Sequence, residues 1–97
     1  MSRLGPLLEY LTEERWVNHS PAPCEGKECL ATAIGTVFMD EDLYPYNTAV
    51  ERAAVELFPE RSNRGRLGSN YVYFNDHPQT TYADVVQVMQ RAEELMG

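Results

Sequence analysis

Apolar residues recur at helical spacing in four stretches of the chain, and polar segments containing proline or glycine separate these stretches. In the first, Leu7 and Leu11 share one side, and the pattern predicts an amphipathic helix of about 10 to 12 residues that closes at Trp16. The second predicts a helix from about residue 28 to about residue 39, with an apolar side wide enough for a central, buried position. Gly35 in the middle of this helix favours a close approach by another element.

The third and fourth helices have a start signal in addition to their periodicity. Thr48 and Thr81 are each followed three residues later by an acidic residue, Glu51 and Asp84. This spacing is typical of a capping box, in which the two side chains bond each other's backbone N–H groups. We therefore expect one helix to begin at each threonine, and Pro59 to end the first of them.

Between these two helices, Tyr71–Phe74 (YVYF) is rich in strand-forming residue types and predicts a short extended or β segment. A lone strand needs a partner for its backbone edges, and RWVNH, residues 15–19, is the other candidate strand in the chain. Otherwise the segment packs across the helices, or two copies pair through it as a homodimer. The predicted fold is mostly α: a single helical domain over residues 1–97, with four helices and one extended segment before the last.

Composition narrows the classes of function. The chain has 97 residues, 43% of them hydrophobic, which suffices for one core. Its formal net charge of −7 argues against nucleic-acid binding, which needs clustered cations. No stretch approaches the ~18 consecutive apolar residues of a membrane span, and a secretory signal is not recognisable. We therefore expect a cytoplasmic protein that binds neither nucleic acid nor membrane.

The two cysteines raise the question of a metal site. Cys24, Cys29, His19 and His77 would supply four ligands. However, the Cys-x4-Cys spacing lies outside the usual paired pattern, and no second Cys or His pair accompanies it. We therefore expect no metal and no cofactor.

A nucleophilic cysteine is the alternative. Cys29 falls in the first turn of the second helix, where exposed N–H groups favour a thiolate. His77 or His19 would be the base, and Asn75 or Asp76 would orient it. Against this, Cys29 continues the row of apolar residues along the second helix. This position is typical of a buried thiol that packs like a small apolar side chain. We favour the core cysteine, and we expect the turn-forming pair Asn75–Asp76 to hold the junction before the last helix.

Four short stretches carry a pattern in fixed order: Trp16 after the first helix, GKECLATAIG (26–35), YFND (73–76) and TYADVVQVMQRAEEL (81–95). Together they resemble an uncharacterised family of small proteins from actinobacteria and their phages. The motifs of that family are a Gly-x-Cys-Cys-Leu-x-Gly-Ala helix start, Trp-Asn-Asp, and a Thr-x-x-Glu-Val helix.

The chain departs from the family pattern in places. Glu28 replaces the first Cys of the pair, Thr32 replaces the Gly, and Phe74 replaces the Trp before Asn75. The resemblance implies an intracellular protein of an actinobacterium or its phage, and it implies no activity. The missing Cys disfavours a dithiol or metal site, whereas the retained Cys29 keeps the nucleophile hypothesis open.

The leading functional prediction is a non-enzymatic, acidic protein-interaction module, encoded by a phage and bound to a host protein. Tyrosines bring large contact area with a polar tip to interfaces, and several lie in or beside the predicted loops: Tyr44, Tyr46, Tyr71, Tyr73 and Tyr82. The candidate binding residues are Tyr44, Tyr46 and the acidic run Asp40–Asp42. The alternative is a cysteine-dependent hydrolase or transferase, with Cys29 as nucleophile, His77 as base and Asp76 orienting it.

Overall fold

Helices make up most of the computed structural model, which describes residues 4–17, 28–62 and 70–96. In chain order the elements are α1 (Gly5–Tyr10), α2 (Leu30–Val37), α3 (Tyr44–Leu57), the 3-10 helix η1 (Pro59–Arg61), α4 (Asn70–Asp76) and α5 (Tyr82–Met96). The mostly helical fold class is therefore confirmed.

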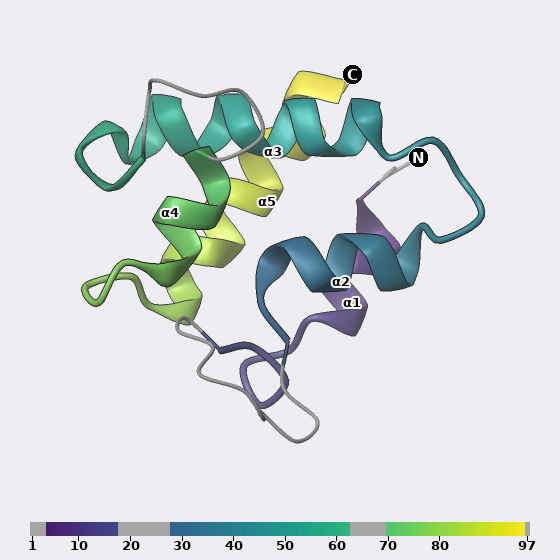
Figure 1. Cartoon of the computed structure of the whole chain (residues 1–97), viewed down its shortest axis with the longest axis horizontal. Helices are drawn as coiled ribbons and strands as arrows, with labels where there is room; N and C mark the ends of the chain where they lie inside the picture. The colour runs from purple at the N-terminus through teal and green to yellow at the C-terminus, as the bar shows by residue number, and fades with distance from the viewer. Residues whose placement is uncertain (1–3, 18–27, 63–69, 97) are drawn as a thin grey trace.

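The helices form two groups around one core. Figure 1 shows α1 and α2 side by side, with α3, α4 and α5 as the second group. The most extensive packing joins α3 to α5, and α4 links the groups because it contacts both α2 and α3. The fully buried side chains come from both groups and include Leu7, Leu30, Ile34, Val50, Phe74, Val88 and Met89.

The first helix is shorter than the pattern predicts. It ends at Tyr10, and the backbone N–H of Trp16 instead donates to the carbonyl of Thr12, 2.9 Å away, in a turn. Trp16 then forms an isolated parallel β-bridge with Glu28, just before α2. The candidate strand 15–19 thus does pair at one position, but with the segment before α2 rather than with Tyr71–Phe74.

The segment Tyr71–Phe74 is helical, so the predicted extended segment is wrong. It lies within α4, where Tyr71 and Phe74 are 5% and 0% exposed and Asn75 is 1% exposed. These positions are three and four apart, which is the spacing of one helix face. The burial of this face in the core overrides the strand preference of the residue types. A homodimer paired through a strand here loses its structural basis.

The two capping-box predictions have opposite outcomes. At Thr81 the prediction is confirmed: its N–H donates to Asp84 Oδ2 at 3.1 Å, and the N–H of Asp84 donates to Thr81 Oγ1 at 3.3 Å. At Thr48 it is wrong, because α3 already begins at Tyr44 and Thr48 lies inside the helix.

The earlier start of α3 has a local cause. Asp42 Oδ1 accepts a hydrogen bond from the backbone N–H of Tyr44 at 3.1 Å, and Pro45 stands in the first turn, where a missing N–H costs nothing.

The surroundings of Gly35, in α2, also differ from the expected close approach of another element. An added Cβ there would meet nothing within 4 Å, so no close approach explains this glycine.

The two threonines give a matched test of the helix starts. Replacing Thr81→Ala should lower the free energy of unfolding by about 1 kcal/mol, because two N–H groups at the start of α5 lose their bonds. Thr48→Ala should change it by less than about 0.5 kcal/mol, since alanine suits a helix interior. Urea unfolding followed by circular dichroism measures both. Equal losses would contradict the assigned start of α3.

Candidate functional site

Large apolar side chains are exposed near the start of α3 and the end of α5. Tyr44 is 66% exposed, Leu95 is 37% exposed, and Met39, in the loop that leads to Tyr44, is 72% exposed. Side chains of this size in contact with water are a feature of binding surfaces when they gather around a hollow.

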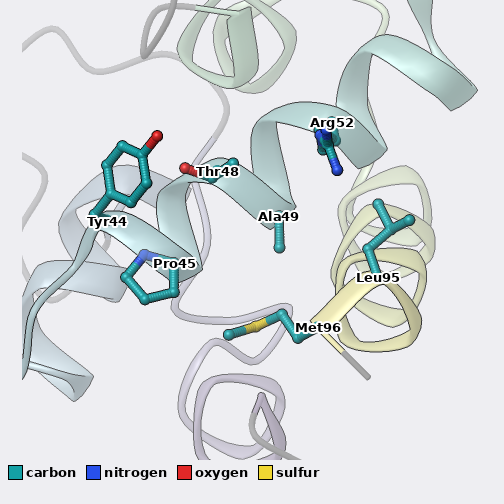
Figure 2. Close-up of a pocket in the computed structure, with 7 residues that line it drawn as sticks. All are labelled: Tyr44, Pro45, Thr48, Ala49, Arg52, Leu95 and Met96. Atoms are coloured by element: carbon teal, nitrogen blue, oxygen red, sulfur yellow. The ribbon is translucent and has the colours of Figure 1, made fainter.

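Such a hollow lies between α3 and α5. We call it the α3–α5 pocket; it has a volume of about 270 Å³ and is lined by Tyr44, Pro45, Thr48, Ala49, Arg52, Leu95 and Met96. Figure 2 shows Leu95 and Met96 on the α5 side opposite Pro45 and Ala49 on the α3 side. Arg52 lies at one end of the pocket and Tyr44 at the other. Apart from Thr48, the lining between these two ends is thus apolar.

The predicted binding residues around this pocket have different roles. Tyr44 lines the pocket and is exposed, and its role in binding stays a prediction. Tyr46, by contrast, is 5% exposed: its ring stacks on Phe38 with 3.9 Å between centroids, and its hydroxyl donates to Glu41 Oε1 at 2.6 Å. Its assignment to the binding surface is therefore wrong, and its role is to anchor the loop between α2 and α3.

The acidic run Asp40–Asp42 is exposed, as a contact surface requires. Asp42 has a structural role as well, because its carboxylate accepts from the backbone N–H of Tyr44. This bond places Asp42 next to the Tyr44 end of the pocket. The run therefore puts negative charge at that end.

Two other tyrosines named in the sequence, Tyr71 and Tyr82, use their hydroxyl groups for hydrogen bonds within the fold. Tyr71 is buried, and its hydroxyl donates to Asn47 Oδ1 at 2.8 Å. Burial, with the charges of Cys29 and Glu51, raises the pKa of Tyr71 to about 12. Tyr82 is partly buried and donates to the carbonyl oxygen of Leu11 at 2.7 Å.

Cys29 is not the buried core thiol that the sequence favoured. It is partly exposed and forms the N-cap of α2, where Sγ accepts from the backbone N–H of Thr32 at 3.5 Å and lies 3.3 Å from Thr32 Oγ1. The apolar stripe of α2 begins only at Leu30, which is fully buried. Sequence spacing did not distinguish the cap from the first buried position.

The proposed orienting residue, Asp76, is the last residue of α4, and the proposed base, His77, follows it. His77 Nδ1 accepts from the backbone N–H of Gln79 at 3.1 Å, and the exposed Asp76 accepts from Asn75 Nδ2 at 3.1 Å. These two bonds join residues one and two positions apart in the sequence. Cys24 and His19, the other two candidate metal ligands, lie outside the described residues. Within residues 4–17, 28–62 and 70–96, no group of three or more His, Cys, Asp or Glu is placed to hold a metal ion.

Asn75 has a role that the sequence did not reveal. It is 1% exposed, and Oδ1 accepts from both Trp16 Nε1 at 2.7 Å and the backbone N–H of Leu30 at 3.0 Å. Its Nδ2 donates to the carbonyl oxygen of Val17 at 3.2 Å. One amide therefore ties the segment after α1, the start of α2 and the end of α4 together.

The junction before α5 is closed instead by Thr80, whose Oγ1 donates to the carbonyl oxygen of Phe74 at 2.8 Å.

The model of a family of unknown function, DUF6197, matches residues 6–95, almost the whole chain. The chain belongs to this family. No curated protein and no solved structure matches it. In this DUF6197 member, three of the separated stretches singled out in the sequence meet at one point, because Trp16, Leu30 and Asn75 are joined by hydrogen bonds.

None of the helices described is long and apolar enough to span a bilayer.

The amide of Asn75 can be tested by removal. Asn75→Ala should lower the free energy of unfolding by about 2 to 4 kcal/mol, because the N–H of Leu30 and the indole N–H of Trp16 lose their buried acceptor. Asp76→Ala, at the neighbouring exposed position, should cost no more than about 0.5 kcal/mol. Urea unfolding by circular dichroism compares the two variants, and similar small losses would contradict the central role of Asn75.

The exposure of Cys29 can be tested by alkylation. In a Cys24→Ser background, native protein should take up N-ethylmaleimide without denaturant, because the N-cap sulfur is open to solvent. The double variant with Cys29→Ser is the control and should take up none. Protection until denaturant is added would restore the core assignment. Labelling far faster than that of free cysteine would favour the nucleophile hypothesis.

Proposed function

We propose that this protein is a non-enzymatic protein-binding module that engages a partner protein through the α3–α5 pocket. The observation that carries the proposal is the gathering of exposed Tyr44 and Leu95, together with Met96, around one hollow on two well-packed helices. Interfaces concentrate their binding energy in a few aromatic and apolar contacts of this kind.

The size of the pocket supports a protein ligand. About 270 Å³ is close to the lower end of the usual range of small-molecule and cofactor sites, and it suits one or two side chains of a partner. The pocket is also built on helices rather than loops, so a partner meets a surface that is already formed.

The enzymatic alternative has less support. The α3–α5 pocket is lined by other residues than Cys29, His77 and Asp76, which would carry the chemistry. A covalent mechanism needs the thiol and its base within hydrogen-bond reach beside a space for substrate. The described bonds of Cys29 stay within the first turn of α2, where its sulfur serves as a helix cap.

Two further elements of the proposal rest on the sequence. The resemblance to actinobacterial and phage proteins supports a partner in an actinobacterial host and, with it, a cytoplasmic location. The acidic charge of −7 supports a partner with a basic surface.

Two leucines with equal exposure provide a matched test. Leu95 lines the α3–α5 pocket, whereas Leu57 lies outside it; both are 37% exposed and close to the end of a helix. Tagged wild type, Leu95→Glu and Leu57→Glu proteins would be purified after cross-linking in an actinobacterial host. We expect a stoichiometric partner with the wild type and Leu57→Glu, and recovery at least about tenfold lower with Leu95→Glu.

Circular dichroism of both variants controls for folding, since each places the same charge at the end of a helix. No stoichiometric partner with the wild type, or equal recovery of the partner with all three proteins, would overturn the proposed function.

A further inference from the structure

The α3–α5 pocket has opposite charges at its two ends. The Tyr44 end adjoins the exposed acidic run Asp40–Asp42, held there by the bond from the N–H of Tyr44 to Asp42. Arg52 stands at the other end, eight residues further along α3, which corresponds to about 12 Å of helix. Between them the lining is largely apolar.

Arg52 differs from the other arginines of the described chain. Arg61 pairs with Asp84 at 2.8 Å, Arg91 pairs with Glu56 at 2.6 Å, and Arg15 lies 4.0 Å from a Glu28 oxygen. Arg52 pairs with no carboxylate in the part of the chain that the structure describes. Arg52 is also exposed, so its guanidinium is accessible to a carboxylate brought by a ligand.

We propose that the pocket recognises a short segment of a partner protein with a fixed order of charges. An aliphatic or aromatic side chain enters the pocket as the anchor, a Lys or Arg on one side of it faces Asp40–Asp42, and an Asp or Glu on the other side faces Arg52. This inference rests on the proposed function and specifies the chemistry of its partner.

The same charges disfavour other occupants. A second copy of this chain would meet three carboxylates of the run Asp40–Asp42, and among the described residues of this face it has one unpaired cation, Arg52, to offer. Each copy also carries a net charge of −7, so the copies repel one another. A nucleic acid would bring phosphates against the same carboxylates.

The charge order can be tested with a displayed library of random 12-residue peptides. The library would be selected against the wild type, Leu95→Glu, Arg52→Glu and Asp40→Lys. Asp40 is chosen because it is exposed, and because the bonds of the loop to Tyr44 and Tyr46 come from Asp42 and Glu41. Peptides enriched by the wild type should share an apolar anchor with a basic residue on one side and an acidic residue on the other.

Each charge inversion should change one side of the selected motif. With Arg52→Glu, the acidic residue should be replaced by Lys or Arg, and a peptide selected on the wild type should bind about tenfold more weakly. With Asp40→Lys, enrichment of the basic residue should fall while the acidic side is kept. Leu95→Glu should enrich no such peptide.

Several results would overturn the inference. These are peptides without a charge order, a motif unchanged by Arg52→Glu, no enriched peptide at all, or a dimer of this chain that Arg52→Glu dissociates. A failure of the charge order can be distinguished from a failure of the proposed function. A cellular partner lost with Leu95→Glu but retained with Arg52→Glu would leave the binding role intact and remove only the charge order.

Discussion

The buried amide of Asn75 is the interaction on which the arrangement of this chain depends. Its Oδ1 accepts hydrogen bonds from the indole N–H of Trp16 and from the backbone N–H of Leu30, at the start of α2. Its Nδ2 donates to the carbonyl oxygen of Val17, in the segment after α1. Buried polar groups are costly unless they are bonded, so these three segments are stable only together. Sequence positions almost sixty residues apart are joined through one side chain.

The α3–α5 pocket lies on a different part of the fold. It is built on the most extensive helix packing in the described chain, and Asn75 does not line it. The structural role of Asn75 and the proposed recognition role of the pocket are therefore carried by different residues, so a change in the pocket need not alter the hydrogen bonds of Asn75. Tyr46 and Asp42 connect the two roles locally, because they fix the loop that brings the acidic run to the pocket.

Sequence patterns predicted the features that depend on neighbouring residues. They were wrong for features that depend on contacts between distant segments or on a choice between two local signals. The mostly helical class and the Thr81 cap follow from periodicity and a short-range bond, and both are confirmed. The start of α3 was misplaced because Thr48 and Glu51 also have the spacing of a capping box, whereas Asp42 with Pro45 provides the actual start. The segment Tyr71–Phe74 was misassigned because strand preference is weak compared with burial against a core that only the whole chain forms.

The candidate site was predicted in part for the same reason. Tyr44 and the acidic run could be found in the sequence because they lie within five consecutive positions of the chain, residues 40–44. Arg52, Leu95 and Met96 could not, since their proximity to Tyr44 depends on how α5 lies against α3. The partial exposure of Cys29 depended on a single residue of helix register, which periodicity does not determine.

Trp16 provides an intrinsic fluorescence probe of this structure. It is the only tryptophan in the chain, and its indole N–H donates to Asn75. Because indole fluorescence responds to the surroundings of the ring, which include Asn75 and Tyr82, the emission of Trp16 reports on the contact between segments distant in sequence without any added dye.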